Sequence, residues 1–479
     1  MKPFYRRHFR LGCLRIACSS LVLACLCQPV AAQLLERLPV DTTLDGVTRE
    51  LDDTVRQVQE SVQKDLLEES VLRDALIQPV DTALAKAPAL VPDLLSAVLP
   101  IVDRRGATVL VDVKVEDGWR AVEREWLLLV DQTALAELAK LDVEIIEQTR
   151  FAGLGLQLVR FRVPAALDSR AALRQRLPAS LHPQLDRNHI YSPQTAAPQS
   201  SQPASSPISS TLPPQAPACV DDLSIGIIDT AIDSAHPAFA GVKIRQQDFI
   251  GADIESPKAH GTAVAGLLVG KGDELQPLLP GATLYAASVF YPRNDYTQGA
   301  TMMNLVRALN WLTEQKVPVI NMSLTGPDNS ILAQAIARVI AAGSLVVAAA
   351  GNEGPAAPPL YPAAYKGVIA VTAVDQQQRP YRWANRGDHI AFAALGVSVV
   401  TARSAGGYGR ESGTSMAAPL VSALVACELA TTPAETVMAQ LIKRAQDLGA
   451  PGRDPIFGHG QLQRHQNVAF KVSEARVSE

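Results

Sequence analysis

Apolar residues in the second half of the chain form short, nearly continuous runs that alternate with helical patterns. The runs are rich in Val, Ile and Ala, as strands are when both faces of a sheet are buried. This alternation predicts a three-layer α/β fold with a mostly parallel central sheet, whose functional sites lie at the carboxyl ends of the strands. The runs cover residues 224–228, 283–288, 317–322, 345–350 and 368–374, and the helical patterns cover 260–269, 301–315, 330–342 and 415–429.

A shorter pattern precedes these runs and predicts a second, smaller fold. Strand-like runs and helical patterns follow one another in the order βαββαβ. This order predicts a small ferredoxin-like α+β domain over residues 105–191, with an antiparallel sheet and two helices on one face. The segments are 126–130, 133–141, 143–146, 156–163, 169–177 and 190–191.

The remaining segments are defined by composition. Residues 192–218 consist mainly of Ser, Pro, Gln, Ala and Thr without a charged residue, which predicts a flexible linker that proteases can cut. Residues 33–104 form a helical N-terminal region, in which apolar residues recur every three or four positions over 44–62. That helix either packs on its own domain or serves as a partner-binding arm. The α/β domain is expected at 219–470 and a C-terminal tail at 471–479.

The beginning of the chain has the pattern of an export signal. Basic residues precede an apolar stretch over 16–27, which ends near the small residues Val30-Ala31-Ala32. We expect a signal peptide over 1–32 and an exported protein, periplasmic or extracellular. Lipid attachment at Cys25 is the alternative. No later segment is apolar and long enough to span a membrane.

Composition and cysteines narrow the function classes. The chain has 479 residues, 47% hydrophobic, with a net charge of -4 and dispersed Lys and Arg, so we expect no nucleic-acid partner. Four of the six cysteines lie in the predicted signal peptide, so the mature protein keeps Cys219 and Cys427. These two either form a disulfide or remain apart, with Cys427 as a buried helical residue.

Four motifs carry candidate chemistry. Asp229 ends an apolar strand, where its carboxylate can orient an imidazole, and His260 begins a helix. Ser415 stands at a helix N-terminus, where the helix dipole favours developing negative charge. Asn352 ends another apolar strand and can supply an amide donor. Each motif alone is typical of a cap or turn, but together they indicate nucleophilic catalysis.

The order Asp, His, Ser and the residues around each motif resemble the subtilisin family of serine peptidases, over roughly residues 225–469. The resemblance implies that Ser415 attacks a peptide carbonyl, His260 transfers the proton and Asp229 orients the imidazole. Asn352 and the backbone N–H of Ser415 would stabilise the oxyanion. It implies peptide or protein substrates, hydrolysis through an acyl-enzyme, and no required cofactor.

The resemblance also implies a substrate-binding strand and one wall of a specificity pocket. Leu360 falls near a position where small residues keep that pocket open, which led us to expect a preference for small or medium apolar side chains. The predicted substrate-binding residues are Ser323, Leu324, Thr325, Gly326, Ala349, Ala350, Gly351 and Leu360.

The chain departs from the family pattern at several points. Ala231 and Thr325 replace residues that are usually Gly, and Ala263 replaces a common second His. The loop over 271–279 is short, which puts the family's calcium site in doubt; Asp273 and Glu274 are expected to form a solvated turn, so we predict no metal site.

The domain over 105–191 resembles the propeptides that precede such proteases. The resemblance implies a zymogen whose N-terminal domain acts as intramolecular chaperone and inhibitor until the linker is cut. Two alternatives remain open. The chain could be a non-catalytic binding module, or the linker could stay uncut and leave the N-terminal domain as a permanent regulator.

Overall fold

A computed structural model describes residues 98–130, 132–194, 222–251, 253–272, 275–294 and 297–463. The chain divides into two units, residues 1–87 and 88–479, and all described residues belong to the second. The predicted signal peptide, the helix over 44–62, most of the linker, Cys219, Asp273 and Glu274 and the tail lie outside the described residues.

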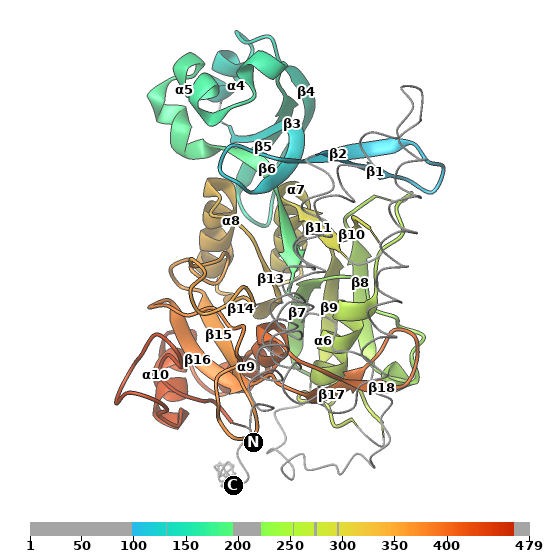
Figure 1. The fold of residues 1–479 in the computed structure, drawn as a ribbon, viewed down its shortest axis with the longest axis vertical. Coiled ribbons are helices and arrows are strands. Elements are labelled where there is room, and N and C mark those ends of the chain that lie inside the picture. The colour runs from blue at the N-terminus through green and yellow to red at the C-terminus, as the bar shows by residue number, and fades with distance from the viewer. Residues whose placement is uncertain are drawn as a thin grey trace, which may run out of the picture. The chain divides into compact units, whose positions relative to one another are not determined.

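The larger part of the described chain is built on a seven-stranded sheet in the order β16-β15-β14-β12-β7-β9-β8 (Figure 1). Every neighbouring pair in it is parallel. The strands are β7 (Ser224–Asp229), β8 (Lys243–Asp248), β9 (Thr283–Ser288), β12 (Val319–Met322), β14 (Leu345–Ala349), β15 (Ile369–Val374) and β16 (Ile390–Leu395). The predicted parallel sheet is confirmed.

Helices cover both faces of this sheet, because successive strand residues point to opposite sides. Ile227 and Val347 pack in one core with α6, α9 and α10. Ile228 and Val346 pack in a second core with α7 and α8. The result is the predicted three-layer α/β fold. The helices are α6 (Ala259–Val269), α7 (Met302–Glu314), α8 (Ser330–Ala341), α9 (Thr414–Leu429) and α10 (Ala434–Arg444).

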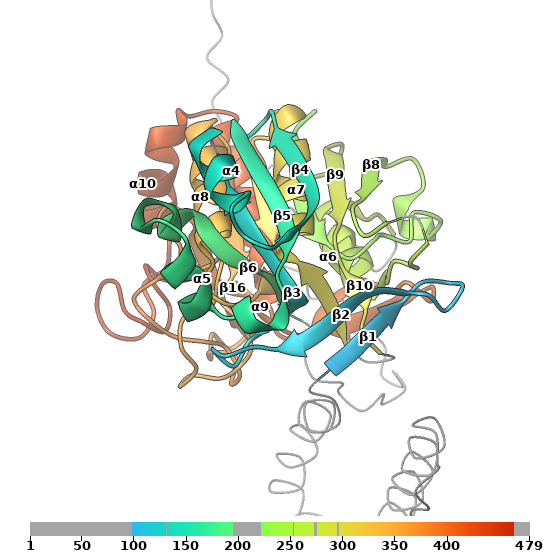
Figure 2. The ribbon, with the colours of Figure 1, turned by 90° about the horizontal axis from the view of Figure 1, so that it is seen from above.

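The N-terminal part forms an antiparallel sheet with the predicted βαββαβ order (Figure 2). Trp126, Phe161 and Leu173 belong to a core between this sheet and its helices. Leu127 and Leu158, on the other face, pack in the same core as α7 and α8. The elements are β3 (Arg120–Leu129), α4 (Gln132–Leu138), β4 (Glu144–Phe151), β5 (Leu156–Arg162), α5 (Arg170–Arg176) and β6 (Leu185–Pro193).

The antiparallel sheet begins earlier than predicted. β1 (Val98–Val102) and β2 (Thr108–Lys114) form a hairpin whose second strand pairs with β3. The expected helical region over 33–104 therefore ends in a strand, and the expected boundary at residue 105 falls in the turn of this hairpin.

The same sheet also ends later than predicted. β6 continues to Pro193 and pairs with β11 (Gln298–Thr301) and β13 (Leu324–Thr325) of the α/β part (Figure 1). β11 in turn pairs with β10 (Tyr291–Pro292). The prediction that a flexible linker begins at Ser192 is therefore wrong for its first three residues, since Gln194 is also buried.

Candidate active site

The predicted acid and base lie together where β7 ends and α6 begins. His260 Nδ1 lies 2.7 Å from Asp229 Oδ1 and 2.9 Å from Oδ2, and both side chains are buried. The N–H of Thr230 donates to Asp229 Oδ1 at 2.7 Å and so helps to fix the carboxylate. A glycine is needed at 261, because a Cβ there would come within 2.3 Å of the carbonyl oxygen of Thr230.

Two opposing effects set the pKa of His260. Burial is the largest single effect and disfavours the imidazolium, but the Asp229 carboxylate, Glu411 and the Gln194 backbone together outweigh it and raise the pKa above its usual value. His260 Nε2 is buried and has no hydrogen-bond partner within the described residues. The carboxylate thus occupies one ring nitrogen and leaves the other for proton transfer.

Ser415 is the second residue of α9, and its hydroxyl is aimed at a peptide carbonyl. Ser415 Oγ donates to the carbonyl oxygen of Gln194 at 2.6 Å. The helix begins after Gly413, whose φ of 148° suits glycine alone. A Cβ there would lie 3.0 Å from Asn352 Nδ2 and 3.3 Å from Ser415 Oγ. Gly413 therefore keeps the approach to the hydroxyl open.

Asn352 points at the same carbonyl. Its Nδ2 donates to the carbonyl oxygen of Gln194 at 3.2 Å. Its Oδ1 accepts from the N–H of Thr414 at 3.0 Å and from the Thr414 hydroxyl at 3.1 Å. These bonds hold the amide with its N–H groups facing the carbonyl, which is the orientation an oxyanion donor requires.

Gln194 is the site residue that sequence reasoning missed. Its N–H donates to the carbonyl oxygen of Ser323 at 3.2 Å, which continues the pairing of β6 with β13. Its side chain is also held, since Oε1 accepts from the N–H of Asn352 at 2.7 Å and Nε2 donates to Thr325 Oγ1. The segment ending at Gln194 therefore lies in the site as an extended peptide.

The remaining predicted substrate-binding residues surround this peptide or lie behind it. Gly326 follows β13 and forms a bridge with Tyr361. Ala349 and Ala350, at the end of β14, are fully buried. Leu360 is also fully buried, and a Cβ on Gly351 would come within 2.7 Å of Leu360 Cδ1.

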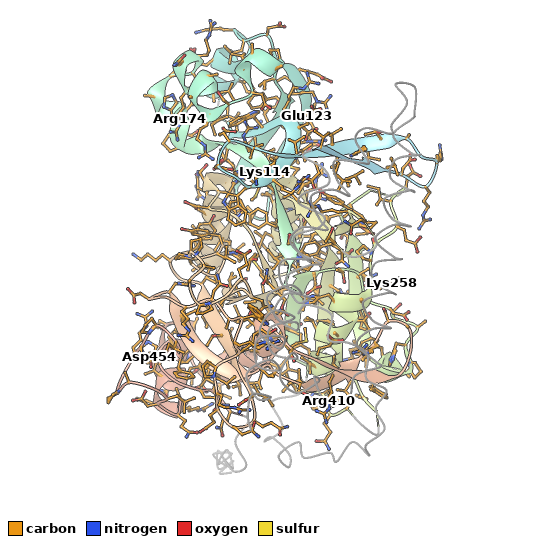
Figure 3. All side chains as sticks on the ribbon, viewed as in Figure 1. Lys114, Glu123, Arg174, Lys258, Arg410 and Asp454 are labelled. Carbon is orange, nitrogen blue, oxygen red and sulfur yellow. The ribbon has the colours of Figure 1, made fainter. Side chains whose placement is uncertain are left out.

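A cavity of about 220 Å³ adjoins the extended peptide. Lys114, which Figure 3 labels, lines it together with Ser192, Thr325 and Glu353. Burial raises the pKa of the Glu353 carboxyl. The cavity is polar, and it lies between the antiparallel sheet and the substrate-binding strand.

Further properties of the described residues concern metal-binding groups, membrane-spanning helices and cysteines. Within them, no group of three or more His, Cys, Asp or Glu side chains could hold a metal ion. None of the described helices is long and apolar enough to cross a membrane. Cys427 of α9 is disulfide-bonded, and every other cysteine of the chain lies outside the described ranges.

An acid–histidine pair at the end of a parallel strand, and a serine and an oxyanion donor on one peptide carbonyl, are features of subtilisin-type serine peptidases. The family model described as "Subtilase family" matches residues 221–460, half of the chain. The chain belongs to the subtilase family.

Individual relatives agree with this assignment. The chain is 31% identical over 265 residues to minor extracellular protease Epr of Bacillus subtilis, covering 53% of this chain and 40% of Epr. It is 32% identical over 225 residues to subtilisin E of the same species, covering 45% of this chain and 57% of subtilisin E. The chain thus spans about half the length of these two relatives. Subtilisin DY of Bacillus licheniformis is 34% identical over 240 residues, which are 48% of this chain and 85% of that protein.

A solved structure supports the fold over a longer stretch. Fervidolysin from Fervidobacterium pennivorans matches with a TM-score of 0.59 at 19% identity, covering 77% of this chain and 63% of fervidolysin. The match extends beyond the region shared with the subtilisins, and it confirms the subtilisin-like fold.

Proposed function

We propose that the protein is an exported serine endopeptidase, made as a zymogen, with Asp229, His260 and Ser415 as its catalytic triad. One observation carries the proposal. The carbonyl oxygen of Gln194 accepts hydrogen bonds from Ser415 Oγ at 2.6 Å and from Asn352 Nδ2 at 3.2 Å. A peptide carbonyl in contact with both the nucleophile and the oxyanion donor marks the bond that follows Gln194 as the candidate for cleavage.

The proposed reaction requires the Ser415 hydroxyl to turn from the carbonyl oxygen of Gln194 to His260 Nε2. Ser415 Oγ bonds to the carbonyl carbon while its proton passes to His260, and Asn352 binds the oxygen as it becomes negative. His260 then protonates the leaving amine, which frees an acyl-enzyme that water hydrolyses by the same steps. Asp229 holds the imidazole tautomer and stabilises its cation. The reaction needs no cofactor.

The N-terminal part is proposed to be both folding template and inhibitor. β6 lies along β13, and Gln194 fills the site where a substrate would bind. We propose that the enzyme cuts its own chain between Gln194 and Thr195, and that the N-terminal part then blocks the site until it is released. Export is supported by the predicted signal peptide and by a relative named as an extracellular protease.

The test is a comparison of the full-length wild type with Ser415→Ala. Loss of the nucleophile is expected to lower turnover by about 10⁶-fold, so casein hydrolysis and self-cleavage both disappear. Wild-type protein should yield a fragment that begins at Thr195, which N-terminal sequencing and mass spectrometry detect. Ser344→Ala is the control, because Ser344 is also buried but precedes β14, at the opposite end of that strand from Asn352, and donates to the carbonyl oxygen of Val317 at 2.7 Å.

Two outcomes would change the proposal. Self-cleavage by purified Ser415→Ala protein would contradict the assignment of the nucleophile. An active wild-type protein whose chain stays intact would make the N-terminal part a permanent regulator instead of a propeptide.

A further inference from the structure

We propose that this peptidase prefers glutamine as the residue before the cleaved bond, and that Thr325 recognises the side-chain amide. The inference rests on the proposed function and names its substrate class. It concerns the side chain of Gln194, whereas the proposed cleavage concerns its carbonyl group.

The geometry defines which pocket the glutamine occupies. The Gln194 carbonyl lies between Ser415 and Asn352, so its side chain occupies the pocket for the residue just before the cleaved bond. Only 7% of Gln194 is exposed. The amide is therefore buried at the point where specificity is decided.

Both ends of this amide have a partner. Gln194 Oε1 accepts from the N–H of Asn352 at 2.7 Å, and Nε2 donates to Thr325 Oγ1. The Asn352 N–H is a fixed backbone donor, and Thr325 is 2% exposed. An apolar side chain in this pocket would leave both groups without a partner, which is costly in a buried site.

Thr325 is one of the positions where the chain departs from the family pattern. Glycine, the usual residue there, has no side chain to meet a substrate. The hydroxyl at 325 therefore provides an acceptor that a glycine lacks. The preference for small or medium apolar residues, expected from Leu360, is replaced here by a preference set by polar groups.

Glutamate is the closest competitor for this pocket. A carboxylate could accept from the Asn352 N–H, and the Thr325 hydroxyl could rotate to donate to it. A second acidic group, Glu353, lines the adjoining cavity together with Thr325. Lys114, Arg120 and Arg293 line the same cavity, so charge does not exclude glutamate, and the inferred preference for glutamine is over apolar side chains alone.

The first test uses the self-activated full-length enzyme and quenched peptides that copy residues 190–197, with Gln, Glu, Met or Leu at position 194. Met matches Gln in length but carries no amide. We expect kcat/KM for the Gln peptide to exceed that for Met and Leu by about 10- to 100-fold. Equal rates for Gln and Met would overturn the inference.

The second test identifies the recognising residue. Thr325→Val keeps the shape of the side chain and removes the hydroxyl, so the Gln-to-Met ratio of kcat/KM should fall by about tenfold. Thr325→Ser keeps the hydroxyl and should keep the ratio. A ratio unchanged in Thr325→Val would overturn the role of Thr325, and thermal melting checks that both variants fold.

Casein hydrolysis separates this inference from the proposed function. If the wild type cleaves casein in a Ser415-dependent way but hydrolyses the Gln and Met peptides equally fast, only the specificity inference fails. If casein is not cleaved at all, the proposed function fails and the inference falls with it.

Discussion

At the scale of single residues, His260 experiences two environments that act in opposite directions. Burial alone would keep the imidazole neutral at low pH, whereas Asp229 at 2.7 Å stabilises the protonated ring. Together with Glu411 and the Gln194 backbone, the carboxylate outweighs burial, and the pKa of His260 is raised above its ordinary value. In the proposed mechanism the neutral imidazole is the base. A raised pKa of His260 therefore means that the enzyme becomes active only at a higher pH.

A pH profile checks this sign. The acid limb of kcat/KM for the Gln peptide should have its midpoint above 6.5, because a larger fraction of His260 stays protonated at each pH. Asp229→Ala removes the carboxylate that raises the pKa of His260. Its residual activity should be lower by about 10⁴-fold, and the midpoint of its acid limb should lie at a lower pH than that of the wild type. A wild-type midpoint at or below 6.5 would contradict the interpretation.

The sequence marks the candidate triad because each of its residues ends or begins a regular element. Asp229 ends β7, His260 lies in the first turn of α6 and Ser415 in the first turn of α9. The fold brings the first two into contact. Gln194 carries no such signal. It stands in a polar, Pro-rich stretch, and its position depends on pairing with β13, which is remote in sequence.

At the scale of elements, the pairing of β6 with the α/β part depends on the absence of a side chain at Gly326. The Tyr191 ring packs against this glycine, and its hydroxyl donates to the carbonyl oxygen of Pro327 at 2.7 Å. A Cβ at 326 would come within 2.3 Å of Tyr191 Cδ1. Because the hydroxyl fixes the far end of the ring, the ring cannot simply tilt away.

Gly326→Ala is therefore expected to displace β6 and slow self-cleavage of the full chain by about 10- to 100-fold, the effect of roughly 1–3 kcal/mol of overpacking. Gel analysis of the precursor over time measures it. The same variant should hydrolyse peptides with Tyr at the position equivalent to Tyr191 more slowly than the wild type does. For peptides with Ala at that position, the decrease in rate should be much smaller. Equal losses for both peptides would show that the variant damages the site itself.

Elements missed from the sequence include buried as well as exposed ones. β8 at the sheet edge is mostly exposed and polar, so it lacks the apolar run by which buried strands are found. β11 is short, and its pairing with β6 is fixed by tertiary contacts. β16 is an apolar run and α10 is an amphipathic helix, so the sequence carried a signal for both, but neither was predicted. Buried elements such as β9 and α8 were predicted to within a residue, since periodicity alone defines them.

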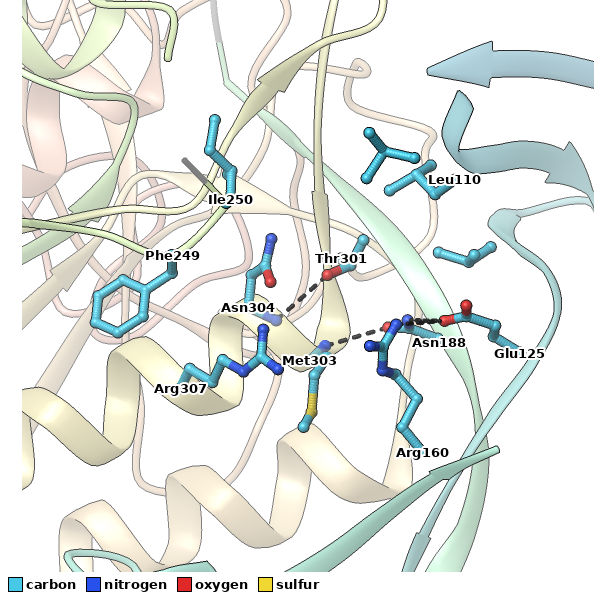
Figure 4. Close-up of a pocket in the computed structure, with 13 residues that line it drawn as sticks. Leu110, Glu125, Arg160, Asn188, Phe249, Ile250, Thr301, Met303, Asn304 and Arg307 are labelled. Carbon is cyan, nitrogen blue, oxygen red and sulfur yellow. Dashed lines mark hydrogen bonds and ion pairs between the residues drawn. The ribbon is translucent and has the colours of Figure 1, made fainter. Parts of the chain in front are cut away.

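At the scale of the whole described unit, the antiparallel sheet is held on the α/β part by polar contacts as well as by its apolar face. Arg307 Nη2 on α7 donates to both carboxylate oxygens of Glu147 on β4 at 2.7 Å. Nearby, the N–H of Met303 donates to Asn188 Oδ1 at 3.1 Å, beside a cavity of about 160 Å³ (Figure 4).

A second ion pair joins the same two parts. Arg293 Nε lies 2.7 Å from Asp112 Oδ2, and Asp112 is fully buried. Burial raises the pKa of Asp112, although Arg293 and Arg120 act to lower it. Charged contacts of this kind contribute to the rate at which a cleaved N-terminal part leaves, because its departure separates the opposite charges.

The rate at which the N-terminal part is released should therefore increase when the charge of Arg307 is removed and when the salt concentration is raised. Arg307→Ala removes a half-exposed ion pair worth about 0.5–1 kcal/mol, so the lag before the full-length protein becomes active should shorten by about two- to fivefold. Raising the salt concentration should shorten the wild-type lag in the same direction, since screening weakens these pairs. Continuous hydrolysis of the Gln peptide gives the lag.

Arg379→Ala is the matched control, because its ion pair with Asp375, also at 2.7 Å, lies within the loop that follows β15. Its lag should equal that of the wild type. A lag unchanged in Arg307→Ala would mean that the apolar face on α7 and α8, together with the β6 pairing, holds the N-terminal part alone. Release would then depend on digestion of that part, and the lag would shorten as enzyme concentration rises.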